Sequence, residues 1–170
     1  REAMTTDANK ATVTLTGETG MHIERIFDAP RERVFAAFTD PELIPQWWGR
    51  RGDTTIVEQM DPVTGGDWRF RCESEEGTIV FRGTFREVTP VERISQTFEW
   101  DGMPGYVSVD NATFEDLGDG RTKVVTDSLF FTKEEREGMV ESGMEGGLNE
   151  TYDRLEELLR LLRGDAARCH

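Results

Sequence analysis

The clearest pattern along the chain is an alternation of apolar and polar residues with a period of two. It is strongest in three consecutive segments near the middle of the chain. Their apolar faces consist of Trp68, Phe70 and Cys72; of Ile79, Phe81, Gly83 and Phe85; and of Ile94, Gln96, Phe98 and Trp100. Such alternation is typical of antiparallel strands with one dry and one wet face. Further strand patterns cover residues 21–27, 54–57, 106–115 and 121–131, which predicts a sheet of six or seven strands.

A helical period replaces this alternation near the C-terminus. Apolar residues recur there at helical spacing, at Met144, Leu148, Tyr152, Leu155, Leu159 and Leu162. The spacing predicts a long amphipathic helix over residues 144–162. A sheet with one dry face needs a cover, and this helix is the element able to supply it. The sequence therefore predicts an α+β fold in which a curved antiparallel sheet wraps around the C-terminal helix.

A helical segment is predicted directly after the first strand, where it would close one end of the sheet. Asp28 and Pro30 form a start signal, because Asp28 can accept from a first-turn amide and Pro30 lacks the amide that goes unpaired there. A second helix-start signal of the same kind begins at Asp40, so we expect two short helices. Of the two adjacent tryptophans that follow, we expect one to anchor this segment and Trp48 to face inward.

Four stretches of the chain carry ordered motifs, at residues 28–49, 65–70, 83–94 and 143–155. Together they resemble the START-like (SRPBCC) superfamily, and within it the homologues of the activator of the heat-shock-protein-90 ATPase. The resemblance extends over about residues 21–162. It implies a helix-grip fold with a ligand cavity between sheet and helix. It indicates the fold more strongly than the function, because members of the superfamily bind and process many unrelated molecules.

The length and charge of the chain limit its organisation and its partners. Its 170 residues predict one domain over residues 11–163, with flexible segments at 1–10 and 164–170. Its 20 basic and 34 acidic residues give a net charge of −14, which argues against nucleic acid or an anionic membrane as a partner. The sequence shows no membrane-spanning run and no signal-peptide pattern, so we expect a cytoplasmic protein. It leaves a homodimer open.

The sequence contains no recognisable motif for a metal, a cofactor or a catalytic nucleophile. His22 has no partner histidine, so we expect it at the surface or in hydrogen bonds. Cys72 is predicted to face the core as an inert thiol. The polar residues best placed for any chemistry are Arg69, Glu87 and Asp110, although the first two are also placed to form a cross-strand ion pair. The sequence thus predicts no metal site, no cofactor and no catalytic residue.

Eight residues are predicted to line a ligand cavity between the sheet and the helix. They are Trp48, Phe70, Phe81, Phe98, Trp100, Met144, Leu148 and Tyr152. The competing interpretation is that these side chains simply fill the core. If the cavity exists, Tyr152 is the candidate to orient a polar end of the ligand.

These residues favour a protein that binds a small apolar or aromatic molecule rather than an enzyme. One alternative is an enzyme that resembles the polyketide cyclases and aromatases of the superfamily, acting in the same cavity. It would need an acid or base inside that cavity, and the sequence alone does not identify one. The other alternative, implied by the family name, is a module that interacts with a chaperone. It would need an exposed apolar docking surface, which the sequence does not reveal.

Overall fold

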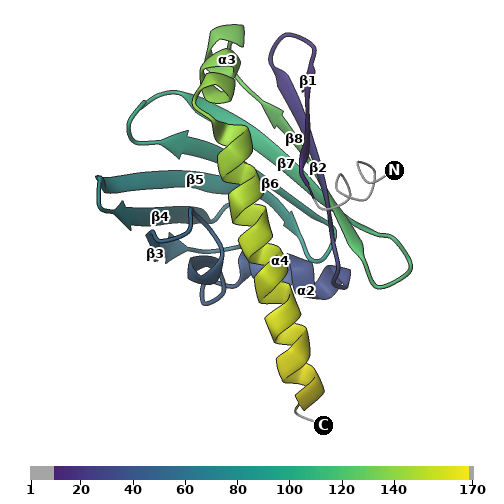
Figure 1. The fold of residues 1–170 in the computed structure, drawn as a ribbon. Coiled ribbons are helices and arrows are strands. Elements are labelled where there is room, and N and C mark those ends of the chain that lie inside the picture. The colour runs from purple at the N-terminus through teal and green to yellow at the C-terminus, as the bar shows by residue number, and fades with distance from the viewer. Residues whose placement is uncertain (1–9, 169–170) are drawn as a thin grey trace.

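The computed structural model describes residues 10–168, which form one sheet and a set of helices (Figure 1). The eight strands within these residues are β1 (Thr12–Thr16), β2 (Gly20–Phe27), β3 (Thr54–Met60), β4 (Asp67–Ser74), β5 (Gly77–Thr89), β6 (Arg93–Trp100), β7 (Val107–Asp116) and β8 (Thr122–Leu129). The helices are α2 (Arg31–Thr39), the 3-10 helix η1 (Ile44–Gln46), α3 (Lys133–Glu141) and α4 (Met144–Arg168). Most of the predicted N-terminal segment 1–10, and Cys169, lie outside the described residues.

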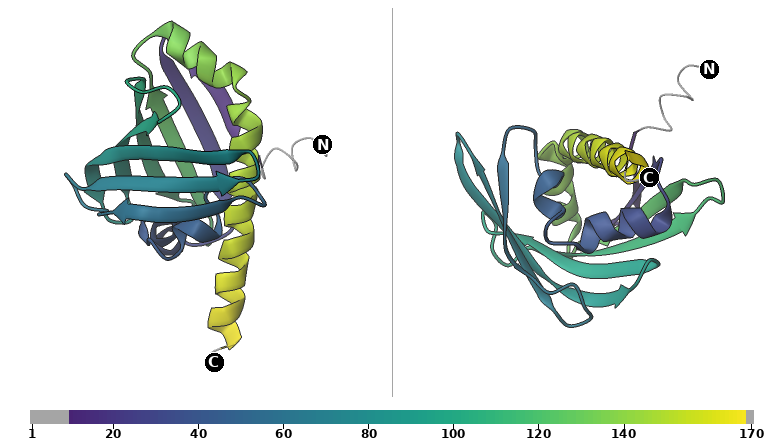
Figure 2. Two further views of the ribbon diagram at one scale, coloured as in Figure 1. Left: turned by 90° about the vertical axis from the view of Figure 1, so that its left-hand side faces the viewer. Right: turned by 90° about the horizontal axis from the view of Figure 1, so that it is seen from below.

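The sheet is antiparallel and follows the order β1-β2-β8-β7-β6-β5-β4-β3. It curves around α4, and α2 and η1 lie at one end of the curve (Figure 2). This confirms the predicted α+β fold with a helix inside a curved sheet. The described chain has eight strands rather than six or seven, because Thr12–Thr16 pairs with β2 as an edge strand. Gly17, at φ +56°, makes the turn between the two strands possible.

The period-two pattern reports correctly which side chains face the inside of the curve. Trp68, Phe70 and Cys72 are buried in β4, whereas the residues between them are partly exposed. The strand register places Phe70 beside Phe81 of β5, so the aromatic positions of neighbouring strands lie next to each other. The apolar side chains therefore gather on the concave face, where α4 covers them.

Helix α2 and η1 form the predicted helical segment, but α2 begins differently from the prediction. Pro30 occupies the N-cap position in an extended conformation, and its carbonyl accepts the first helical bonds at 3.0 and 3.1 Å. The predicted capping by Asp28 is wrong, because Asp28 lies two residues before the cap and its amide donates to Glu156 Oε1 at 3.3 Å. Asp40 acts as expected, since its Oδ1 accepts from the Glu42 amide at 2.9 Å.

The last two helices are separated by a glycine. Thr132 caps α3, because its Oγ1 accepts from the Glu135 amide at 3.1 Å. Gly143, at φ +84°, ends that helix and allows α4 to begin in a new direction. Helix α4 runs to Arg168 and is thus longer than the predicted helix, which ended at 162. No helix among residues 10–168 has the length and apolar composition that crossing a bilayer requires.

Side chains, rather than backbone contacts, connect α4 with the concave face of the sheet. The α4 backbone lies near those of α2, η1 and α3 at more positions than near that of any strand. The distance between helix and sheet must therefore be spanned by side chains from both elements.

Candidate functional site

Five aromatic side chains, four from the concave face of the sheet and one from the segment after η1, form a group called here the aromatic wall: Trp48, Trp68, Phe70, Phe81 and Phe98. The Trp48 ring centroid lies 5.1 Å from those of both Phe70 and Phe81, in edge-to-face geometry. The Phe81 and Phe98 centroids are 5.4 Å apart, and Trp68 lies 4.8 Å from Phe70. Four of the eight residues predicted to line a cavity are thus brought together.

The two adjacent tryptophans, Trp47 and Trp48, have different structural roles, as expected. Trp47 is 2% exposed, and its Nε1 donates to the Ala37 carbonyl at 2.9 Å. Its ring packs on Phe38 at 5.0 Å. Trp47 therefore anchors the helical segment, whereas Trp48 is only half-buried and reaches the aromatic wall.

Trp100 is the predicted residue that the structure places apart from the aromatic wall. It is in register with Phe81, yet it is 38% exposed and its indole lies against Gly102 in the following turn. The physical reason is its position as the last residue of β6, at the rim of the sheet.

Helix α4 supplies the other three predicted residues, and its burial changes along its length. Tyr152 is 7% exposed, and Leu155, almost one turn later, is fully buried. Met144 and Leu148, in the first turns of the helix, are only half-buried. Gly147 is also half-buried, and a Cβ atom placed on it would meet nothing within 4 Å beyond its own helix backbone and chain neighbours. Helix and sheet therefore pack tightly around Tyr152, whereas the first turns of α4 are less completely covered.

Tyr152 belongs to the tightly packed part of the interior. Its ring lies edge-on to Phe27, with centroids 5.3 Å apart, and 6.4 Å from Trp47. Its hydroxyl group hydrogen-bonds with Thr126, and burial raises the pKa of Tyr152 to about 12. This geometry favours a structural role for the hydroxyl over the expected role in orienting a ligand.

A carboxyl group, Asp110 of β7, lies on the same concave face. The register places Asp110 between Gln96 of β6 and Ser128 of β8, so the three side chains share one face. The Ser128 hydroxyl donates to Asp110 Oδ1 at 2.7 Å. Burial raises the pKa of Asp110 to about 6, against the lowering effect of the Ser128 bond. Although the carboxyl lies deep in the fold, part of the residue's surface stays accessible.

The other two polar residues proposed for chemistry have ordinary structural roles. Arg69 Nε lies 2.8 Å from Glu58 Oε1, and Glu87 Oε1 lies 3.2 Å from Arg93 Nε. The expected ion pair between Arg69 and Glu87 is therefore wrong. The alternation predicts the faces of both strands correctly, but the strand register gives Arg69 and Glu87 different partners. Both pairs lie at the surface, where such contacts stabilise a fold by about 0.2–1 kcal/mol.

His22 and Cys72 take the positions expected of them. His22 bonds to Glu24 through Nε2 at 2.7 Å and to Asp127 through Nδ1 at 2.6 Å. The bond to Glu24, followed by the bond to Asp127, raises the pKa of His22. Cys72 is buried, and this burial raises the pKa of its thiol. Of the residues that the structure describes, no three His, Cys, Asp or Glu side chains are grouped closely enough to hold a metal ion.

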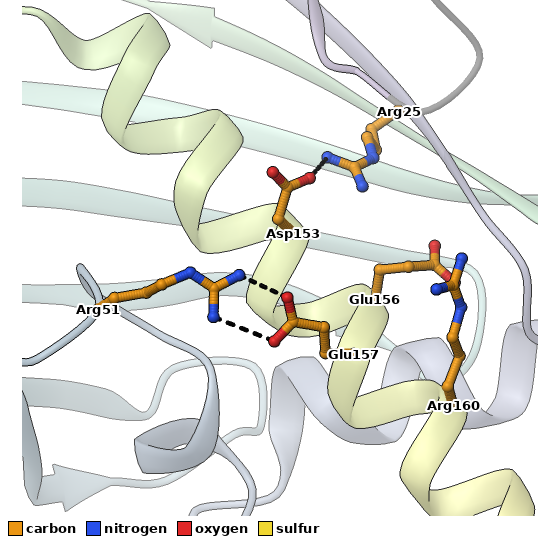
Figure 3. Close-up of a pocket in the computed structure, with 6 residues that line it drawn as sticks. All are labelled: Arg25, Arg51, Asp153, Glu156, Glu157 and Arg160. Atoms are coloured by element: carbon orange, nitrogen blue, oxygen red, sulfur yellow. Dashed lines mark hydrogen bonds and ion pairs between the residues drawn. The ribbon is translucent and has the colours of Figure 1, made fainter. Parts of the chain in front are cut away.

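A pocket of about 240 Å³ lies on another side of α4 and is lined by charged residues (Figure 3). Its lining is Arg25, Arg51, Asp153, Glu156, Glu157 and Arg160. Arg25 Nη1 lies 3.1 Å from Asp153 Oδ1, and Arg51 bonds to both carboxylate oxygens of Glu157 at 3.1 and 2.5 Å. The lining thus balances three positive with three negative side chains, which gives it no clear preference for a ligand of either charge.

Comparisons with known proteins agree with this architecture. A family model described as "Activator of Hsp90 ATPase homolog 1-like protein" matches residues 28–160. No curated protein matches the chain. A solved structure from Rhodobacter sphaeroides is similar, with a TM-score of 0.83 and 24% identity, covering 89% of this chain and 99% of that one.

Two further solved structures illustrate the range of proteins with this fold. An AHSA1 protein from Silicibacter pomeroyi has a TM-score of 0.69 and 23% identity, covering 84% of this chain and 98% of its own. DynU16, a protein of the dynemicin biosynthetic locus, has a TM-score of 0.65 and 19% identity, covering 84% of this chain and 47% of its own. At these identities the solved structures show a shared fold. Because the family model spans most of the sequence, the chain belongs to the family of activator of Hsp90 ATPase homolog 1-like proteins, within the START-like superfamily.

Proposed function

We propose that this protein binds a small apolar or aromatic molecule between the concave face of the sheet and the first turns of α4. The molecule would lie on the aromatic wall and touch Met144 and Leu148 from the helix side. Trp48 would stand at the opening, because it is half-buried and joins the helical segment to the wall.

The observation that carries this proposal is the change in burial along α4. Around Tyr152 and Leu155 the apolar side chains are almost completely buried, as in an ordinary core. Near Met144 and Leu148 the same apolar stripe faces the same sheet but remains half-exposed. A ligand that completes this burial gains free energy from the hydrophobic effect. A naphthalene-sized body that buries roughly 200 Å² gains about 5 kcal/mol before the cost of immobilising it.

Asp110 favours a second candidate, an enzyme of the cyclase or aromatase type. Such an enzyme needs an acid or base in the cavity, and Asp110 has a pKa of about 6 on the concave face. Binding remains the preferred function for a geometric reason. The Tyr152 hydroxyl, which could have acted as a second acid or base beside Asp110, is already bonded to Thr126.

The experiment uses N-phenyl-1-naphthylamine, a neutral apolar dye whose emission rises in a dry site, and two glycine variants. Gly147 lies one helical turn before Thr151, whose hydroxyl bonds to the backbone of Gly49 next to Trp48. A leucine at position 147 therefore projects toward the proposed opening. We expect Gly147→Leu to weaken dye binding by about tenfold or more, a loss of at least about 1.4 kcal/mol.

Gly146→Leu is the matched control, because Gly146 is exposed and also has no atoms around it within 4 Å. Both changes replace a helical glycine with a better helix former and should raise the stability by up to about 1 kcal/mol. Gly146→Leu should bind the dye as well as the wild type. A wild-type protein that takes up no dye, or equal effects of the two variants, would show that these aromatic side chains are only core.

A further inference from the structure

Asp110 differs from the other carboxylates near the interior of the described chain because it has no positive partner. Arg25 is buried beside Asp153, and Glu156 lies 3.5 Å from Arg160. Across residues 10–168, no basic side chain forms an ion pair with Asp110, and none contributes to its pKa. In the described part of the chain its carboxyl group accepts one hydrogen bond, from Ser128 to Oδ1, so Oδ2 is left for another donor.

The position of Asp110 relative to the aromatic wall follows from the strand register. Phe98 of β6 is paired with Ser108 of β7, and Asp110 lies two residues further along the same face. Diagonal neighbours of this kind are about 7–8 Å apart between strands. A single molecule can therefore rest on the ring of Phe98 and reach the carboxyl group with one short polar arm.

We propose that the occupant of this site is an organic cation, an ammonium group on an apolar or aromatic body, and that the ammonium pairs with Asp110. The inference rests on the proposed function and adds the charge of the ligand to it. A buried carboxylate without a counter-ion is unfavourable, and a cationic ligand supplies the missing charge. Aromatic rings also attract cations through their faces, which an apolar anion or a neutral molecule would not exploit.

The charge of the whole protein acts in the same direction. With a net charge of −14, the protein attracts cations from solution and repels anions. The ligand class that fits Asp110, the aromatic wall and the net charge together is thus an amine with a compact apolar body.

The test compares two probes of nearly the same shape, 2-naphthylmethylamine and 2-naphthylmethanol, by isothermal titration calorimetry at pH 8. The amine should bind more tightly than the alcohol. Asp110→Asn keeps the shape of the side chain but removes its charge, so it should weaken amine binding by on the order of thirtyfold or more. The same change should leave alcohol binding within about twofold, since the alcohol carries no charge to lose.

The control variant is Asp127→Asn, because Asp127 is an exposed carboxylate on the neighbouring strand that contacts His22 rather than the interior. It removes the same charge from the protein and should leave both probes unaffected. An equal loss of amine binding in both variants would assign the effect to net charge and overturn the inference.

A pH series supplies a second readout. The amine stays protonated over pH 5–8, so its binding should weaken as Asp110 takes up a proton near pH 6. Alcohol binding should not follow this change. The titratable group that faces Asp110 from α4 is Tyr152, with a pKa of about 12, and Arg25 of β2 lies beside that tyrosine. Tyr152 therefore stays uncharged throughout this range.

The outcomes separate this inference from the proposed function. If the alcohol binds as tightly as the amine and Asp110→Asn affects neither, the site exists but its occupant is not a cation. If neither probe binds, and the neutral dye also fails, both the inference and the proposed function are overturned. Preferential amine binding that depends on Asp110 supports both.

Discussion

Asp110 should cost the protein stability at neutral pH, and replacing it with asparagine should therefore stabilise the fold. In the unfolded chain an aspartate has a pKa near 3.8, whereas burial raises that of Asp110 to about 6 in the folded protein. The difference is about two units, and each unit corresponds to about 1.4 kcal/mol. The ionised carboxylate thus lowers the free energy of unfolding by about 3 kcal/mol above pH 7.

The sign of the pH dependence follows from which state holds the proton. Between about pH 4 and pH 6 the folded protein keeps the proton on Asp110, whereas the unfolded chain has released it. Raising the pH through this window therefore favours unfolding, and the penalty is complete once the folded carboxyl is ionised. Below the unfolded pKa both states are protonated, so the ionisation penalty vanishes there.

The measurement is urea unfolding of the wild type and of Asp110→Asn at a series of pH values from 4 to 8. Asparagine can still accept the Ser128 hydrogen bond, so the variant loses the charge and little else. The stability of the variant relative to the wild type should increase by about 3 kcal/mol across the series, or by roughly 6–12 °C in melting temperature. Taking this difference cancels the contributions of carboxylates such as Glu24, Glu58 and Glu99, whose pKa values are lowered by their partners. A difference that stays constant with pH would refute the idea that Asp110 is desolvated.

Two further predictions concern side chains far from the aromatic wall. Arg136 is buried and donates to three backbone carbonyls of the β1–β2 hairpin. Arg136→Met should therefore lower the free energy of unfolding, measured by urea denaturation, by about 2–3 kcal/mol. An unchanged urea midpoint would contradict this role. The pKa of His22, followed by NMR, should lie above 6.5, and it should fall in Glu24→Gln and further when Asp127→Asn is added. Because the folded pKa is raised, the stability that His22 contributes is present below pH 6.5 and lost as the pH rises through the folded value.

Much of the fold could be predicted because it depends on local patterns. The alternation in β4 follows from the pleat of a strand, and it placed Trp68 and Phe70 correctly on the buried face. The capping of α3 by Thr132 needs only the next three residues, so it is visible in the sequence. The long stripe of α4 is also local, and its role as the cover of the sheet follows from the absence of another candidate.

The errors concern partners that the sequence does not encode locally. The pairing of Arg69 with Glu58 depends on the register between β3 and β4, which includes a bulge after Val57. The edge strand β1 forms because β2 offers it a free edge, not because its own pattern is strong. The sequence pattern also does not predict a large exposed apolar side chain at position 131, yet Phe131, just after β8, is 85% exposed. Exposure at the end of a strand depends on which loops cover it, and this is decided by the whole fold.

The candidate site illustrates why a functional residue can be difficult to predict from the pattern of apolar and polar residues. In β7 and β8 the alternation of apolar and polar residues is weak because several inward positions are polar. These positions, where a core would place apolar residues, are Ser108, Asp110, Thr126 and Ser128. A sequence selected only for stability would fill these positions with valine or isoleucine, which are favoured in strands. The carboxyl at position 110 is instead expected to lower stability at neutral pH, and the strand register places it diagonal to Phe98. Natural proteins break local rules mainly at functional sites, so the strands with the weakest pattern are where a ligand is best sought.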